Sequence, residues 1–373
     1  MTDPGRTGTG PLAGVRVVEL AGIGPAPLAG MLLADLGADV VFVERPAATG
    51  IAALVPKRHL ITNRGKRLTR IDLKSEAGRA QLLELASRAD VLIEGLRPGA
   101  IERLGLGPND LHRVNPALVI CRVTGWGQTG PRARTAGHDI TYIAMTGALD
   151  LIGRRGEPPV PPINFLGDYA GGTMFAVVGI LAALLEARRS GRGQVVDAAM
   201  TDGVGALLAP LIGMVAGKRW IPERGSNLFD TGAPFYDVYR TKDGRWLALG
   251  ALEDEFFAQL AKGLGLSEAE IVDRGNPARW PALRKTLDER VASRTRDEWV
   301  AIFEGTDACV APVLGLEEAV RHPDNVARGA FVDVDGVPQP APAPRLSRTP
   351  LRPPAPPPET FADPAAIAAE WTR

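Results

Sequence analysis

The chain has 373 residues, of which 45% are hydrophobic, and its formal net charge is zero. This length allows two domains with a large core, and the balanced charge argues against nucleic-acid binding, which usually requires a basic excess. The only cysteines, Cys121 and Cys309, lie too far apart for a metal or redox motif, and the first eleven residues lack the apolar stretch of a signal peptide. We therefore expect a soluble cytoplasmic protein.

The first half of the chain alternates between predicted strands and helices. Strands are expected over residues 15–20, 40–44, 68–73, 91–94 and 118–123, and helices over residues 27–36 and 75–89. This alternation predicts an open, Rossmann-like parallel sheet in an α/β fold, with ligands bound at the carboxyl ends of the strands. The apolar run 173–185 is short for a membrane span and is interpreted as a buried helix, so no membrane partner is expected.

The second half has a different pattern. Small apolar residues over 193–215 predict connecting helices, and alternating segments around Lys242-Asp243-Gly244 predict a hairpin, with helices following to about residue 320. The proline-rich stretch 337–358 is expected to form an extended strap, and residues 361–373 a short helix. We predict a large α/β domain over 1–195 to which 330–373 returns, connecting helices over 196–228, and a small α+β domain over 229–329.

Two short motifs carry the candidate chemistry. His138 lies in a glycine-flanked turn after the fifth predicted strand, and Asp168 precedes a small-residue turn that opens an apolar helix. We expect the backbone N–H groups at Asp168 to point out of that helix N-terminus, where they would stabilise negative charge. A histidine and a carboxylate beside an anion site suit proton abstraction next to a carbonyl. A hydrogen-bonded structural histidine and an aspartate helix cap remain the alternatives.

Other candidates are less informative. His59, His112 and His322 lie in polar, loop-like surroundings, and Cys309 is expected to be a small buried hydrophobe. The segment 22–27 begins like a dinucleotide-binding fingerprint, and Glu44 ends the next strand. However, Pro27 replaces the third glycine, which disfavours nicotinamide binding.

Basic residues follow several predicted strands. Arg45 follows the second strand, Lys74 the third, and Arg97 and Arg103 the fourth. Since parallel strands end at one edge of a sheet, these residues predict a phosphate-bearing ligand at that edge. Solvated surface side chains are the alternative interpretation.

Segments distributed from about residue 11 to residue 350 resemble the family III CoA-transferases, and within them the α-methylacyl-CoA racemase branch. The matching stretches include VLIEGLRPGAIERLGLG, VTGWGQTGP, AGHDITY, GDYAGG and GAPFYDVYRTKDG. The resemblance implies that His138 and Asp168 are an acid/base pair, and that Glu253 hydrogen-bonds the histidine. In transferase members the aspartate is instead a nucleophile. Those members typically lack this histidine and carry a glycine-rich loop, which is absent from ERGSNLFDTGAPFYDVY.

The resemblance also implies how coenzyme A is bound. Arg45 and Arg103 would contact its nucleotide end. Its cleft would be lined by Ile71, Asp72, Leu73, Lys74, Gly95, Leu96 and Arg97. The segment 137–142, including Gly137, Asp139 and Tyr142, would meet the pantetheine and the reacting end. The family further implies an interlocked homodimer in which the small domain of one subunit completes the site of the other.

These observations favour an isomerase of lipid metabolism that interconverts the R and S forms of 2-methyl-branched acyl-CoA thioesters through an enolate. No metal, nicotinamide or flavin is expected. Coenzyme A is part of the substrate and is not counted as a separate cofactor. A CoA-transferase with Asp168 as nucleophile is the nearest alternative, and a catalytically silent CoA-binding protein is the alternative from another class.

Overall fold

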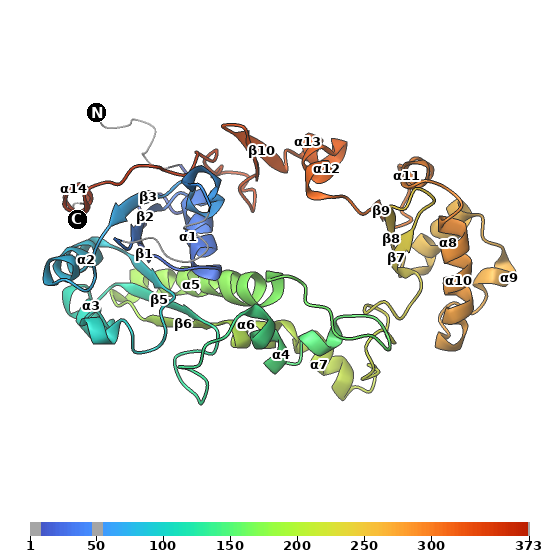
Figure 1. Ribbon diagram of the computed structural model, residues 1–373, viewed down its shortest axis with the longest axis horizontal. Coiled ribbons are helices and arrows are strands. Elements are labelled where there is room, and N and C mark those ends of the chain that lie inside the picture. The colour runs from blue at the N-terminus through green and yellow to red at the C-terminus, as the bar shows by residue number, and fades with distance from the viewer. Residues whose placement is uncertain (1–8, 47–54, 372–373) are drawn as a thin grey trace. The chain divides into compact units, whose positions relative to one another are not determined.

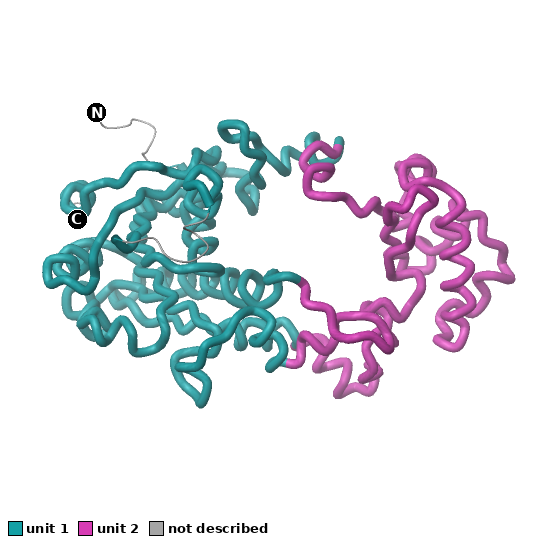
Figure 2. The backbone as a smooth tube through the Cα atoms, viewed as in Figure 1, with its two compact units in different colours: residues 1–146, 163–208, 323–373 teal, residues 147–162, 209–322 magenta. Residues whose placement is uncertain are grey.

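A computed structural model describes residues 9–46 and 55–371 (Figure 1). It divides into two compact units, one formed by residues 1–146, 163–208 and 323–373, and the other by residues 147–162 and 209–322 (Figure 2). These bounds differ from the predicted domains. Residues 196–208 of the predicted connecting segment cluster with the larger unit, whereas residues 147–162 and 209–228 cluster with the smaller unit. The return to the larger unit begins at residue 323 instead of 330.

The larger unit contains a six-stranded parallel sheet. Its strands are β1 (Arg16–Leu20), β2 (Asp39–Glu44), β3 (Arg67–Arg70), β4 (Val91–Glu94), β5 (Val119–Thr124) and β6 (Val195–Ala199). They lie in the order β3-β2-β1-β4-β5-β6. The predicted open parallel α/β fold is confirmed. The order reverses between β1 and β4, and such a switch point is where open α/β sheets bind ligands.

Helices cover both faces of this sheet. Successive strand residues enter different apolar clusters: Val17 packs with α1 (Pro25–Asp35) and α5 (Phe175–Ser190), whereas Val18 packs with α2 (Glu76–Arg88) and α14 (Pro364–Glu370). This alternation follows from the two-residue period of a strand and gives near-continuous apolar strands. Further helical segments of this unit are η2 (Lys57–His59), η3 (Ile61–Asn63), η4 (Glu102–Leu104), α3 (Pro108–Val114), α4 (Asp139–Met145), η6 (Phe165–Met174), α6 (Met200–Leu207) and α13 (Pro323–Arg328).

The prediction of helices over the whole segment 193–215 was wrong in part. The first part of this segment forms β6, which pairs with β5. A Cβ at Gly193 would lie 2.0 Å from the Leu118 carbonyl oxygen, so glycine lets the chain approach the start of β5 closely. A short apolar run is compatible with either a strand or a helix. Here the segment forms a strand because the edge of β5 offers backbone hydrogen-bond partners to residues 195–199.

The apolar helix is longer than the sequence pattern indicated. The π-helical segment η6 continues into α5, giving a helical stretch Phe165–Ser190 of 26 residues that is long and apolar enough to cross a membrane. Half of the most apolar 18-residue stretch of this helix is buried inside the structure, and the core helices of soluble proteins can be equally long and apolar. The expectation that this helix is too short to span a membrane was therefore wrong. The expectation that it is buried holds for half of its most apolar stretch.

The smaller unit has a three-stranded antiparallel sheet covered by helices. The predicted hairpin is present as β7 (Tyr236–Arg240) and β8 (Trp246–Gly250), and β9 (Val310–Pro312) pairs with β8. The helical segments of this unit are η5 (Leu149–Leu151), α7 (Ala209–Ala216), α8 (Asp254–Leu264), α9 (Glu268–Ile271), η7 (Pro277–Arg279), α10 (Trp280–Val291), α11 (Arg296–Phe303) and α12 (Leu316–Arg321).

The returning segment docks along the larger unit. After α13 it forms a hairpin of β10 (Phe331–Val334) and β11 (Val337–Pro340), so the predicted extended strap begins only after residue 340. Further on, Phe361 forms a parallel bridge to Leu68 of β3, and Trp371 donates from its indole nitrogen to Asp39 at 2.8 Å. The last helix, α14, belongs to the sheet core through Ile367, which is fully buried.

Candidate active site

A cavity of about 660 Å³ lies in the larger unit at the carboxyl ends of the central strands. Its walls include the segments after β1 (22–27) and after β4 (95–98) and the end of β5 with the following turn (123–126), and therefore come from both sides of the switch point. His138 and Asp168 both line it. The structure thus brings together two candidate residues that are separated by 30 positions in the sequence.

The backbone of His138 is fixed by a threonine one turn along the helix. His138 is the N-cap residue of α4, and its N–H donates to the Thr141 hydroxyl at 3.0 Å. The same hydroxyl donates to the His138 carbonyl at 2.7 Å. These two bonds hold the main chain, while the imidazole side chain is exposed at the cavity wall.

Asp168 lies in the first turn of η6 and is half-buried. Asn164 donates to its Oδ2 atom at 3.1 Å. Burial raises the pKa of the Asp168 carboxyl. The Asn164 hydrogen bond lowers this pKa, the nearby Asp139 carboxylate raises it, and His138 lowers it. The net direction is upward, which suits a carboxyl that both accepts and returns a proton.

The expected anion site at Asp168 loses one of its two donors. The Asp168 N–H is not free, because it donates to the Oδ2 atom of Asp139 at 2.7 Å. The N-terminus of α4 packs against η6 so closely that a Cβ at Gly167 would lie 2.6 Å from the same Oδ2 atom. The Asp139 side chain, from the neighbouring helix α4, therefore accepts the Asp168 N–H. The sequence around Asp168 does not indicate this contact.

Five of the residues expected to contact coenzyme A line the cavity, namely Gly95, Leu96, Arg97, Gly137 and Tyr142. Arg45, Asp72, Lys74 and Arg103 are exposed outside it, and Leu73 is half-buried. Ile71 is 2% exposed in the apolar core, and the Asp139 side chain is buried behind His138. Residues 45, 71–74 and 95–97 follow β2, β3 and β4 at the same sheet edge, as predicted, because the strands are parallel.

A buried ion pair holds the loop after β4. Glu94 accepts the Leu96 N–H at 2.6 Å and pairs with Arg122 on β5 at 2.7 Å. Arg122 also pairs with Glu102 at 2.8 Å. Because the Glu94 side chain is fully buried, both partners constrain the loop that presents Gly95, Leu96 and Arg97 to the cavity.

The sequence analysis assigned no site role to several residues that line the cavity: Pro25, Trp126, Asn164, Tyr169 and Met200. Residues after β1 and β5 follow from the order of a doubly wound sheet, so this signal was present. The sequence contains no comparable signal for Asn164 and Met200, which are brought in by helix packing.

Glu253 belongs to the smaller unit. It is the exposed N-cap residue of α8, and its neighbour Asp254 is engaged by Arg274. The expected hydrogen bond between Glu253 and His138 stays a prediction.

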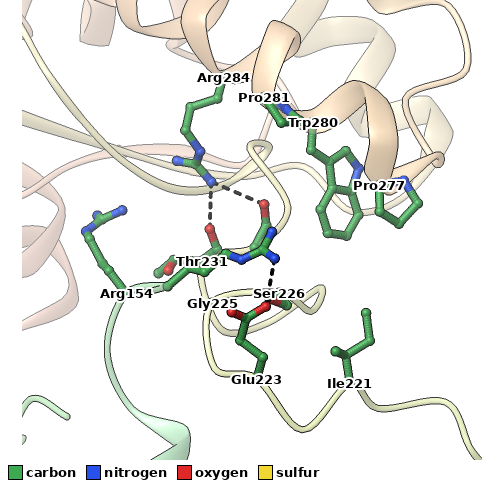
Figure 3. A pocket seen from close by; sticks show the side chains of 12 residues that line it. Arg154, Ile221, Glu223, Gly225, Ser226, Thr231, Pro277, Trp280, Pro281 and Arg284 are labelled. Atoms are coloured by element: carbon green, nitrogen blue, oxygen red, sulfur yellow. Dashed lines mark hydrogen bonds and ion pairs between the residues drawn. The ribbon is translucent and has the colours of Figure 1, made fainter. Parts of the chain in front are cut away.

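The smaller unit has a cavity of its own, of about 420 Å³, with arginines on one side and Trp280 on another (Figure 3). Arg284 donates to the carbonyl oxygens of Thr231 and Gly232, and Arg155 pairs with Glu223 at 2.8 Å. Arg154 and Arg284 share the buried carboxylate of Asp237. These cations are thus already neutralised by protein groups.

The remaining candidates are placed as follows. The ring of His112 bonds the Leu118 carbonyl at 3.0 Å, His59 is exposed, and Cys121 is buried. The expectation that Cys309 is buried was wrong, because this residue is exposed, with a φ of 51°, just before β9. Among residues 9–46 and 55–371, no group of three or more His, Cys, Asp or Glu side chains is arranged to hold a metal ion.

The turn that begins like a dinucleotide fingerprint is poor in backbone donors. The first three residues of α1 are Pro25, Ala26 and Pro27, and the two prolines have no N–H group. A phosphate at this helix N-terminus would therefore find few of the donors on which such sites depend.

The chain is similar in sequence and fold to several known proteins. The chain is 47% identical to alpha-methylacyl-CoA racemase of Mus musculus, over 92% of this chain and 88% of that protein. It is 44% identical to the Homo sapiens protein of the same name, with the same coverage. The crystal structure of a CAIB/BAIF family protein from Brucella suis superposes with a TM-score of 0.82 at 30% identity, covering 98% of this chain and all of the other. The model of CoA-transferase family III matches residues 12–363, and the chain belongs to that family.

Proposed function

We propose that the chain is an α-methylacyl-CoA racemase, an isomerase that interconverts R and S 2-methyl-branched acyl-CoA thioesters. The observation that supports this best is that His138 and Asp168 line one cavity at the switch point of the sheet. The named racemases at 44% and 47% identity support the same reaction class.

The reaction needs two proton carriers. One group removes the α-proton and leaves an enolate, and the other returns a proton to the opposite face of the planar carbon. A single base tends to return the proton to the face it left, which gives exchange without inversion. His138 and Asp168 therefore start each turnover in opposite protonation states, and their roles exchange between the two enantiomers. The N–H of Asp168 is bonded to Asp139, so another donor must stabilise the enolate oxygen.

The proposed reaction removes one proton, returns another and changes no oxidation state, so we propose that it uses no cofactor beyond the coenzyme A of the substrate. Gly137 and Tyr142 line the cavity and are assigned to the pantetheine arm and the reacting end, and Arg97, which also lines it, is assigned to the coenzyme A cleft. The exposed Arg45 and Arg103 are assigned to the nucleotide end, since guanidinium groups bind phosphates well.

The protein is further proposed to act as a cytoplasmic homodimer in lipid metabolism, with Glu253 of the partner subunit facing His138. Exposed apolar residues on the long helical segment support a contact with a second copy. They include Met174, Val178 and Leu185, which are 50%, 62% and 70% exposed. Patches of this kind on a protein surface mark interaction sites.

The test is incubation of the purified protein with one enantiomer of a 2-methylacyl-CoA in deuterated water. We expect deuterium at the α-carbon and loss of optical purity. His138→Ala should slow racemisation by about 10²- to 10⁴-fold. The control is His112→Ala, because the ring of His112 bonds a backbone carbonyl outside the cavity.

Three outcomes would contradict the proposal. If the His138→Ala variant keeps full activity, the assignment of His138 is wrong. If exchange is absent but a covalent adduct forms on Asp168 and CoA passes to an added carboxylic acid, the protein is a transferase. If acyl-CoA binds with neither exchange nor transfer, the protein is a silent binder.

A further inference from the structure

Asp139 is bonded to the segments of both proposed bases. It is the residue directly after His138, at the first position of α4, and its side chain accepts the backbone N–H of Asp168 at 2.7 Å. The residue is 6% exposed. One buried carboxylate therefore ties the main chain of Asp168 to the turn that carries His138.

The contact is tight on both sides. An added Cβ on Gly167 would lie 2.6 Å from Oδ2 and 2.9 Å from Cγ of Asp139, so η6 approaches this carboxylate as closely as glycine permits. The other oxygen, Oδ1, is buried without a hydrogen-bond partner among the described residues. A buried carboxylate oxygen without a partner is unfavourable for folding. Oδ1 therefore adds nothing to stability, and the contact that Asp139 makes in this packing is the one from Oδ2 to the Asp168 N–H.

From this geometry we infer that Asp139 is a positioning residue that sets the placement of Asp168 relative to His138 on opposite faces of the reacting carbon. The inference rests on the proposed racemase function. It gives the Asp139 side chain a role different from the expected contact with coenzyme A, because the carboxylate is turned into the protein and does not line the cavity.

The consequence for the reaction is specific. When Asp168 is misplaced, His138 still breaks the α-C–H bond of one enantiomer, takes up the proton, and returns a proton or a deuteron from solvent to the same face. Inversion needs delivery from Asp168 to the other face. Loss of the Asp139 contact therefore slows inversion more than exchange. A general loss of folded protein lowers both rates by the same factor.

The carboxylate also acts through its charge. His138 and Asp139, at the start of α4, act on Asp168 through their charges, and Asn164 donates a hydrogen bond to it. Burial raises the pKa of Tyr142 on α4 and the negative charge of Asp168 in turn raises it further, whereas the positive charge of Arg97 lowers it. Of these groups, Asp139 is the carboxylate that opposes ionisation of Asp168. Removing this charge while keeping an acceptor oxygen separates the electrostatic effect from the hydrogen bond.

The experiment compares Asp139→Ala, Asp139→Asn and Gly167→Ala with the wild type. For each enantiomer, α-deuterium incorporation and inversion are measured separately. In Asp139→Ala we expect inversion to fall by about 100-fold, the loss typical of a catalytic group misplaced by about 1 Å. Exchange into the enantiomer that uses His138 as base should fall less, so the exchange-to-inversion ratio rises.

The other two variants make the result specific. Asp139→Asn keeps an oxygen for the Asp168 N–H, so the ratio should stay near that of the wild type while the acid limb of the pH profile moves to lower pH. Gly167→Ala keeps the charge but displaces the carboxylate, so it should raise the ratio without that movement. If Asp139→Ala does not fold, these two variants decide the question.

Asp110→Ala is the matched control, since Asp110 also accepts a backbone N–H, from Gly107 at 3.2 Å, in the first turn of α3. It should leave the ratio unchanged. If the wild type racemises and the ratio stays constant in Asp139→Ala or in Gly167→Ala, the positioning inference is overturned. If the wild type exchanges no α-proton, the proposed function itself has failed, which is a distinguishable result.

Discussion

At the scale of single residues, the proposed chemistry depends on neighbouring groups that have opposite effects on the pKa of the Asp168 carboxyl. Burial and Asp139 raise the pKa of Asp168, whereas Asn164 and His138 lower it. Since its folded-state pKa is raised, Asp168 binds a proton more readily than a solvated aspartate. It becomes a competent base only above that raised pKa.

Asn164 offers a direct test of this balance, because it donates to Asp168 at 3.1 Å. Asn164→Ala removes a hydrogen bond that stabilises the charged form, so the pKa of Asp168 should rise further. We expect the acid limb of kcat/KM to move to higher pH for the enantiomer that uses Asp168 as base. A pH–rate profile for each enantiomer checks this, and an unchanged or lower limb would show that Asn164 does not tune Asp168.

The same scale shows why part of the site was predictable from sequence. His138 and Asp168 lie in recognisable local motifs, and the structure places both in one cavity. The bond from Asp168 to Asp139 joins residues 29 positions apart and depends on how α4 packs on η6. No local pattern encodes that packing, and the sequence-based expectation of a free N–H at Asp168 was wrong for this reason.

At the scale of elements, the turn after β1 is held by a buried ion pair. Lys66 and Glu19 are 2.7 Å apart and both side chains are fully buried. Lys66 also donates to the carbonyl of Pro27 at 2.9 Å, in the first turn of α1 that lines the cavity. A Cβ at Gly30 would lie 1.7 Å from the Glu19 carboxylate, so α1 passes directly over the pair.

Removing one partner should be costly. Lys66→Met leaves Glu19 buried without its counter-ion, and we expect the free energy of unfolding to fall by about 3–5 kcal/mol. Replacing both residues, as in Glu19→Leu with Lys66→Met, should recover much of this loss because no unpaired charge remains. Urea unfolding of the single and double variants measures the difference, and a loss below about 1 kcal/mol for Lys66→Met would contradict the argument.

The pH dependence of that loss follows from the carboxyl. Burial raises the pKa of Glu19 from 4.5 to about 7 even with Lys66 present. A group whose pKa is raised by folding contributes stability below its unfolded pKa and loses it as the pH rises through the folded value. The defect of Lys66→Met should therefore be larger at pH 8 than at pH 5. Arg113→Met, which removes an exposed pair with Asp110, is the control and should cost at most about 1 kcal/mol at either pH.

At the scale of the whole molecule, the proposed dimer can be tested on α5. Val178 and Leu185 are seven positions apart on one helix face and are 62% and 70% exposed. Sedimentation equilibrium should give twice the mass of one chain, and Val178→Glu should weaken association because it buries a charge in the contact. Val326→Glu, at a residue that is also 62% exposed but lies on α13, should leave the mass unchanged. A monomer at every concentration would contradict the homodimer.

The sequence by itself determined the architecture of the larger unit and the two motifs in its cavity. Strand and helix periods are local, and parallel strands necessarily bring residues 45, 71–74 and 95–97 to one edge of the sheet. Tertiary structure alone decided that 195–199 becomes an edge strand, that the apolar helix extends over 26 residues, and that Asp139 caps Asp168. Each of these depends on contacts between segments distant in the chain, because burial and hydrogen bonding across elements outweigh weak local preferences.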